Sequence, residues 1–293
     1  QFRGDIMELK HTATRQGRLS SFLREEMKMS AGLMNRLKWK ELLFVNGVPQ
    51  HTDYPVQEGD VITVPLDDPA PQYPAEEGEL TILYEDDHIL AVDKPAGMLI
   101  HPSRSRLTGT LANYVLGYYQ KTGQNCAFHP ITRLDRDTFG VVLLAKNSHI
   151  HAILNETHNQ GLLQKTYHAL VYGGPDGEEG IIDAPIARRP LPSLLRYVNQ
   201  DGKPSLTKFR VLERLPGYSK LALQPVTGRT HQLRVHCAHM GYPILGDPQY
   251  GSAESMAFSE EMGLKTQVLC AKTLEFPHPM TDGPMSIQSK LTV

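Results

Sequence analysis

The chain has 293 residues, of which 40% are hydrophobic and 21% are charged, and its formal net charge at pH 7 is −2. These values are ordinary for a folded globular protein, and the length suggests about two domains. Because the chain as a whole is not a polycation, any binding of nucleic acid must come from local basic patches, whose attraction for phosphate acts over about 8–10 Å. No apolar run approaches the ~18 residues that a membrane-spanning helix needs.

The three cysteines are odd in number and widely spaced, at Cys126, Cys237 and Cys270. This pattern argues against a disulfide or zinc framework and favours reduced thiols. We therefore expect a cytoplasmic protein that is not attached to a membrane, with a monomer as the default state.

Residues 1–66 are predicted to form a small α/β domain. Apolar residues at helical spacing predict a helix over 19–27, and Ser30 is placed to cap a second helix that runs through Lys38. The Asn-Gly pair in "LFVNGVPQ" predicts a hairpin, and "VITVPL" predicts a further strand. Seven basic residues and two acidic ones lie between Arg15 and Lys40. Charge alone allows either a solvated helical face or one that meets phosphates.

A stretch rich in proline and acidic residues follows at 67–79, and its composition is typical of a linker. The second domain is predicted at 80–293. Strands are expected in the two runs of 80–97, over 140–146 and 165–173, and in a hairpin around Pro216-Gly217; helices are expected over 110–123, 147–161 and 230–241. Strands outnumber helices and recur as hairpins. This order predicts an α+β fold with a mixed, largely antiparallel sheet rather than a doubly wound parallel one.

Alternating opposite charges stand just before the buried-looking strand at 140–146, in "RLDRD". If this segment is extended, Arg133, Asp135 and Asp137 share a face, because side chains alternate along a strand. The simplest interpretation is a turn with surface ion pairs, each worth about 0–1 kcal/mol. The alternative is that one aspartate points into a cleft.

Four motifs in order favour the alternative: "VDKPAGMLIHPS", "RLDRDTFGVVLLAK", "KTYHALV" and "TGRTHQLRVHCAHMGYPILGDPQYG". Together they resemble the RluA family of RNA pseudouridine synthases, and residues 1–66 resemble the small RNA-binding domain of the S-four type. The resemblance implies the pseudouridine synthase fold and an isomerase that converts uridine in RNA to pseudouridine without metal, nucleotide or redox cofactor. It also implies that the basic helical face of the first domain meets RNA. The lack of a phosphate-binding loop motif in the sequence agrees with this expectation.

The resemblance also implies roles for the catalytic residues. Asp135 matches the essential aspartate, which would act on the ribose carbon, on the base or as a proton abstractor. Arg234 matches its basic partner, and a neighbouring guanidinium typically lowers the pKa of an aspartate by about 1–3 units, so we expect Asp135 to be ionised. Tyr167 matches the active-site tyrosine, whose ring would stack on the uracil. Asp137 is expected to be a turn residue.

Further residues are expected to bind the substrate. Arg133 matches an arginine that lies near the flipped nucleotide, and Leu245 would line the pocket. Arg229 and His231, in the same motif as Arg234, would contact the RNA. The chain has Thr132 and Phe139 where the family often has His and Ser or Thr. These differences leave the substrate subgroup open.

Other functions fit the sequence less well. His231, His236, His239 and Cys237 lie close in sequence, but their spacing fits no zinc motif, so we expect no metal site. A glycosidase normally needs a pair of carboxylates with divided roles, and only one aspartate stands in a motif. A non-catalytic RNA-binding or ribosome-assembly protein would not need Asp135, Tyr167 and Arg234 together. Large-subunit ribosomal RNA is the expected target, with transfer RNA as the alternative.

Overall fold

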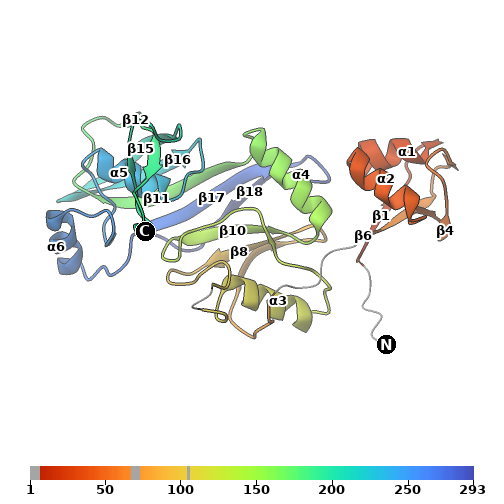
Figure 1. The fold of residues 1–293 in the computed structure, drawn as a ribbon, viewed down its shortest axis with the longest axis horizontal. Helices are drawn as coiled ribbons and strands as arrows, with labels where there is room; N and C mark the ends of the chain where they lie inside the picture. Colours follow the sequence, from red (N-terminus) through yellow and green to blue (C-terminus); the bar gives the residue numbers. More distant parts are fainter. Residues whose placement is uncertain (1–6, 67–72, 104–105) are drawn as a thin grey trace.

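The computed structural model describes residues 7–66, 73–103 and 106–293. The chain forms a small unit at one end and a larger unit built on a long sheet (Figure 1). The last strand of the small unit ends at Leu66. None of the described helices is long and apolar enough to cross a membrane.

The small unit pairs short strands with two helical segments around its own core. One sheet has the order β1-β6-β3-β4, and β2 pairs with β5. The Ser30 hydroxyl accepts a hydrogen bond from the Leu33 amide at 3.2 Å, so Ser30 caps α2 as predicted. The helix predicted over 19–27 is interrupted, since α1 continues as the π-helical turn η1. The elements are β1 (Met7–Thr12), β2 (Gly17–Arg18), α1 (Leu19–Ser21), η1 (Phe22–Glu26), α2 (Ala31–Trp39), β3 (Phe44–Val45), β4 (Val48–Pro49), β5 (Pro55–Val56) and β6 (Val61–Leu66).

The larger unit is an α+β fold around a ten-stranded mixed sheet, as expected. The strand order is β12-β15-β16-β11-β17-β10-β8-β7, with β18 added beside β17 and β9 beside β10. Among the described strands only β10 and β17 pair in parallel. The large-sheet strands are β7 (Thr81–Glu85), β8 (Ile89–Lys94), β9 (His129–Pro130), β10 (Phe139–Ala145), β11 (Gln164–Tyr172), β12 (Glu179–Asp183), β15 (Leu206–Leu215), β16 (Tyr218–Pro225), β17 (Leu269–Pro277) and β18 (Pro284–Gln288).

Helices cover both faces of this sheet, which explains why β8 and β10 are buried on both sides and why residues 89–92 and 141–145 read as continuous apolar runs. Asn147 and Thr110 cap α4 and α3 through their side chains. Gly140 adopts φ +112°, and a Cβ there would lie 2.3 Å from the Ala271 carbonyl oxygen, so only glycine lets β10 pass β17 this closely. The remaining elements are α3 (Leu111–Lys121), α4 (Ser148–Asn159), β13 (Ile186–Arg188), β14 (Arg196–Val198), α5 (Gln232–His239) and α6 (Ala253–Glu261).

The segment predicted as a linker differs from expectation in its second half. Residues 67–72 lie outside the described residues. Residues 73–79 pack against α3: Glu76 accepts a hydrogen bond from the Gly109 amide, and the Asn113 side chain donates to the Pro74 carbonyl at 2.9 Å. Tyr73 also packs on the core of the larger unit. This polar stretch is therefore held by hydrogen bonds to α3, which composition does not reveal.

Polar contacts join the two units. Lys28 Nζ lies 2.6 Å from Asp282 Oδ1, and His149 Nε2 lies 2.8 Å from the Met27 carbonyl oxygen. The small unit thus rests against the start of α4 and the loop before β18.

Candidate active site

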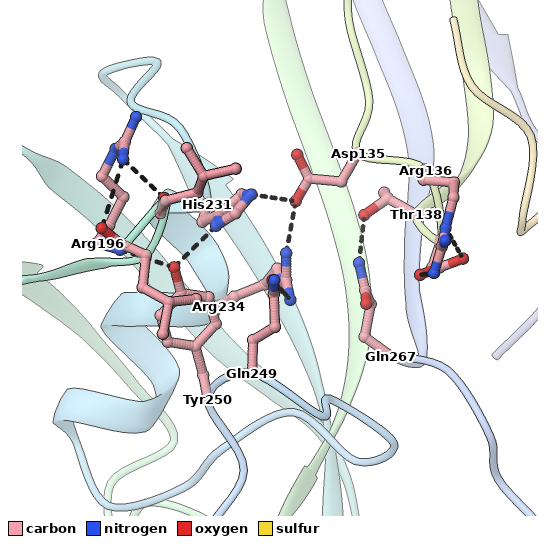
Figure 2. Close-up of polar contacts among 12 residues, drawn as sticks. Asp135, Arg136, Thr138, Arg196, His231, Arg234, Gln249, Tyr250 and Gln267 are labelled. Atoms are coloured by element: carbon pink, nitrogen blue, oxygen red, sulfur yellow. Dashed lines mark hydrogen bonds and ion pairs between the residues drawn. The ribbon is translucent and has the colours of Figure 1, made fainter. Parts of the chain in front are cut away.

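Asp135 lies on a tight turn at the entrance of β10. The short strand β9 pairs with the far end of β10, and residues 131–138 connect the two strands. The Thr138 amide donates to the Asp135 carbonyl at 3.2 Å, which closes the turn. Because of this turn the extended alternation ends at Asp135, and Asp137 does not share its face. Asp137 instead pairs with its neighbour Arg136, and Thr138 lies between Arg136 and Arg234 in the view of Figure 2.

The residue that departs from the family pattern just before "RLD" also helps to fix this segment. Thr132 is only 3% exposed, and its hydroxyl accepts a hydrogen bond from the Leu143 amide at 3.0 Å. The segment is therefore pinned to β10 ahead of Asp135.

Lys94, at the end of β8, is hydrogen-bonded to the turn that carries Asp135. Its side chain is fully buried, and its ammonium donates to the carbonyls of Pro95, Met98 and Arg136 at 2.8–2.9 Å. Burial lowers the pKa of Lys94 to about 8, although Asp137 and Asp135 oppose this shift. Lys94 therefore ties the Asp135 turn to the end of a central strand.

We expect Lys94→Met to lower the free energy of unfolding by about 2–4 kcal/mol, because three partly buried carbonyls lose the charged donor that they share. Urea denaturation measures this change. Lys121→Met, at an exposed position at the end of α3, is the matched control and should change stability by less than about 0.5 kcal/mol. Equal effects of the two substitutions would contradict the support that we assign to Lys94.

Arg234, on α5, reaches Asp135 from the opposite wall of the cleft. One guanidinium nitrogen lies 3.1 Å from Asp135 Oδ2 (Figure 2). The arginine is 4% exposed and also binds both oxygens of Asp247, at 2.7 and 2.8 Å, and Gln249 Oε1 at 2.7 Å. Burial by itself would lower the pKa of Arg234, but the hydrogen bonds and charge of Asp247 raise it. The guanidinium is thus a fixed cation aimed at Asp135.

Asp247 anchors this cation from a fully buried position. It accepts hydrogen bonds from the amides of Gln249 and Tyr250, at 3.0 and 3.3 Å, in addition to those from Arg234. The Tyr250 ring lies against the Arg234 guanidinium, 5.0 Å from its centroid. Bidentate geometry fixes the orientation of the guanidinium as well as its position.

His231 stands at the start of α5, between Tyr250 and Asp135. Its Nδ1 lies 2.8 Å from the Tyr250 hydroxyl, which also accepts a hydrogen bond from the Arg196 amide, and its Nε2 lies 3.9 Å from Asp135 Oδ2 (Figure 2). The backbone of His231 is left-handed, with φ 58°, a conformation that costs a non-glycine residue energy and occurs often at functional sites. Burial lowers the pKa of His231, which keeps the imidazole neutral near pH 7.

Tyr167, on β11, completes the centre of the cleft. It is 9% exposed, and it lines a cleft of about 1020 Å³ together with Asp135 and Arg234. Burial raises the pKa of Tyr167 well above its usual value, and the charge of Asp135 adds to the effect. The hydroxyl is therefore protonated at neutral pH, and the ring offers an apolar surface beside the carboxylate.

Of the other residues that were predicted to bind the substrate, two line the cleft and one does not. Arg133 and Arg229 are exposed and line the same cleft. Leu245 does not line it: the side chain is fully buried, and its backbone is hydrogen-bonded to Leu170 and Val268. The prediction that Leu245 lines the pocket is therefore wrong. In the "PILGD" segment it is Asp247 that reaches the site, where it binds Arg234.

Sequence reasoning missed several residues that position the site. Lys94, Asp247 and Tyr250 lie within the quoted motifs but received no role. Gln232 is 4% exposed; its Oε1 accepts from the Thr227 hydroxyl and the Arg229 amide, and its amide group donates to the Leu206 carbonyl, so it holds the loop that precedes His231. For Lys94 the available signal was a charged pair directly after the apolar run 89–92, but the spacing did not show which groups that pair would meet.

His231 and His236 contact polar groups of the protein through their ring nitrogens. His236 lies 2.9 Å from both the Thr207 hydroxyl and the Ala184 carbonyl oxygen, and Cys237 is fully buried. In the part of the chain that the structure describes, no three His, Cys, Asp or Glu side chains are grouped to hold a metal ion. The three cysteines are buried and none forms a disulfide.

Comparisons with known proteins agree with this geometry. Residues 88–239 match the family model described as RNA pseudouridylate synthase. The chain is 38% identical over 251 residues to the uncharacterized RNA pseudouridine synthase YjbO of Bacillus subtilis, a match that covers 85% of this chain and 86% of the relative. It is 33% identical over 286 residues to ribosomal large subunit pseudouridine synthase C of Vibrio cholerae, covering 94% and 89%.

A solved structure shares the fold over three quarters of the chain. Human RNA pseudouridylate synthase domain containing 1 superposes with a TM-score of 0.61 at 26% identity, covering 75% of this chain and 86% of that one. The segment that matches the family model contains Asp135, Tyr167 and Arg234, since all three lie within residues 88–239.

Proposed function

This chain belongs to the RluA family of RNA pseudouridine synthases, which are isomerases, and we propose that it isomerises a uridine of large-subunit ribosomal RNA with Asp135 as the essential residue. One observation carries the assignment of the residue. The Asp135 carboxylate opens into the cleft within 3.1 Å of a buried arginine, and Tyr167 lines the same cleft. The carboxylate of Asp137, two residues away, instead accepts two hydrogen bonds from the Arg136 guanidinium.

The reaction needs no external reactant, because the product has the same atoms as the substrate. The bond between the ribose C1′ and uracil N1 breaks, and a bond between C1′ and uracil C5 forms. C5 loses one proton and N1 gains one. Asp135 either attacks C1′ or the base, or takes a proton, and the geometry supports each of these roles because the carboxylate is accessible while Arg234 fixes its position.

Neighbouring groups hold the nucleotide and limit water. Tyr167 offers its ring as a stacking surface for the uracil, and its protonated hydroxyl can donate a hydrogen bond. Arg133 supplies a cation at the edge of the cleft, where an inserted guanidinium can offset part of the few kcal/mol that unstacking a base costs. Lys165, which lines the same wall, has its pKa lowered by burial and by Arg133. Two adjacent cations favour a phosphate between them.

The target is proposed from the relatives and from the small unit. Relatives from Vibrio cholerae and Xanthomonas campestris are named as large-subunit ribosomal enzymes. Residues 1–66 are proposed to be an RNA-binding domain of the S-four type, because α2 carries an exposed basic face at one end of the chain. We further propose that the protein acts in the cytoplasm as a monomer and without a cofactor. Transfer RNA remains the alternative target.

The decisive experiment maps pseudouridine with a carbodiimide that leaves adducts on it, in ribosomal and transfer RNA from cells with and without the gene. We expect one or a few large-subunit uridines to lose their adduct when the gene is absent, and to regain it when wild-type protein is supplied. Loss confined to transfer RNA would assign the alternative target. If every adduct persists without the gene, the proposed activity is wrong for these RNAs.

A further inference from the structure

The single tryptophan of the chain, Trp39, is 86% exposed and is the last residue of α2. A large aromatic side chain loses favourable burial when it faces water, so an exposed tryptophan commonly marks a binding surface. The small unit does not need Trp39 for its core, since Met34 and Leu37 provide the buried face of α2. The 3.6-residue repeat places Trp39 about 200° around the helix from Leu37, on the side away from that core.

The residues that share this side of α2 form a stripe, defined here as Gly32, Asn35, Arg36 and Trp39. Helical spacing puts all four within about 60° of Trp39, and all four are exposed. Lys38 and Lys40 flank the stripe, and Glu41 is the acidic residue next to it in sequence. The stripe therefore combines an aromatic ring, an amide and a guanidinium, and two lysines lie next to it.

Gly32 adds a second observation. Gly32 lies in the first turn of α2, although glycine destabilises a helix relative to alanine. Here a Cβ at position 32 would meet nothing within 4 Å, and the backbone of Gly32 does not require glycine. The fold of this chain gives no reason for the missing side chain. It leaves the first turn of α2 open to close approach by another molecule, about 10 Å along the helix from Trp39.

We propose that the stripe Gly32, Asn35, Arg36 and Trp39 is a docking surface for single-stranded RNA, on which an unpaired base stacks on Trp39. Charge complementarity selects this partner, because three cations flank the aromatic ring and an RNA chain carries a phosphate at every nucleotide. Arg36 binds a phosphate, Asn35 is placed for a hydrogen bond to a base edge, and the open surface at Gly32 admits the RNA backbone. The inference rests on the proposed function and deepens it, since it names the residues of α2 that bind RNA and the form of RNA that they bind.

The single tryptophan makes the test direct. Its fluorescence is followed while the full-length protein is titrated with a single-stranded RNA of mixed sequence and, separately, with a fully paired RNA duplex. We expect the single strand to quench the emission and the duplex to quench it much less, because paired bases are not free to stack. Trp39→Ala should weaken binding of the end-labelled single strand by about 5- to 150-fold, the range measured for one stacked base.

Control variants separate a binding role from a structural one. Val48→Ala removes an exposed apolar side chain of the same unit and should change the RNA affinity less than twofold. Arg36→Gln should reduce the slope of log affinity against log salt by about 0.7, the value for one phosphate of a single strand. Gly32→Leu should leave the thermal midpoint unchanged or higher while it weakens RNA binding, a combination that a purely structural role cannot produce.

The outcomes are distinguishable from a failure of the proposed function. With transcripts labelled by tritium at uracil C5, Trp39→Ala should raise KM at unchanged kcat. If RNA quenches Trp39 but the wild-type protein releases no tritium, the docking surface stands and the proposed activity fails. If neither RNA changes the emission and Trp39→Ala binds RNA like the wild type, the proposal is overturned. Quenching by RNA-free ribosomal proteins alone would also overturn it, in favour of a protein partner.

Discussion

Asp135→Ala is expected to lower kcat/KM for pseudouridine formation by at least about a thousandfold, the range seen when a group that takes part in the chemistry is removed. The carboxylate is the group that opens into the cleft opposite Arg234 and Tyr167. The release of tritium from uracil C5 of the RNA identified by mapping measures this loss. Thermal unfolding of the variant should stay close to wild type, because the Asp135 side chain is 31% exposed.

Asp137→Ala is the matched control, since it removes the same group two residues away. Its carboxylate is paired with Arg136, whose side chain is 60% exposed, so this substitution should leave activity within about tenfold of wild type. Asp135→Asn keeps the shape of the side chain and should be as inactive as Asp135→Ala. Equal losses at positions 135 and 137 would show that the turn, and not one carboxylate, matters.

Arg234→Gln is expected to destabilise the fold by about 3–5 kcal/mol and to remove activity as well. The reason is that Asp247 is completely buried and would lose its bidentate partner, and an unpaired buried charge is strongly unfavourable. Urea denaturation measures the first effect. Arg136→Gln, an exposed arginine of the adjacent turn, should cost less than about 1 kcal/mol.

A double variant separates the two roles of Arg234. Adding Asp247→Asn to Arg234→Gln removes the uncompensated charge, so the double variant should be more stable than Arg234→Gln alone. Activity should not return, since nothing then holds Asp135 from that side. If the double variant regained activity, the loss in Arg234→Gln would be a consequence of unfolding and the cation would have no role at the carboxylate.

Local signals in the sequence were enough for most elements of the fold. The Ser30 cap, the hairpins at Asn46-Gly47 and Pro216-Gly217 and the buried strand before Lys146 all appear as predicted. These features depend on hydrogen bonds and periodicity within a few residues, so neighbouring residues specify them. The first helix was less regular than predicted, since a π-helical turn follows Ser21.

The candidate site was only partly predictable. The motifs indicated Asp135, Tyr167 and Arg234, and the structure brings the three to one cleft. They did not indicate that Asp247 would hold Arg234, or that Leu245 would be buried away from the cleft. The motifs name residue types in order, but which of two adjacent residues faces a cleft depends on the exact course of the loop that carries them.

The sequence by itself determined most of the elements, the α+β class and the three candidate residues Asp135, Tyr167 and Arg234, because these follow from short-range periodicity and from motifs. Tertiary structure alone decided how charges pair across long separations. Arg234 meets Asp135 from 99 positions away, and the Lys94 ammonium reaches the Arg136 carbonyl across 42. Such pairings depend on the order and register of the strands in the sheet, which fix the distance between two charges only once the chain has folded.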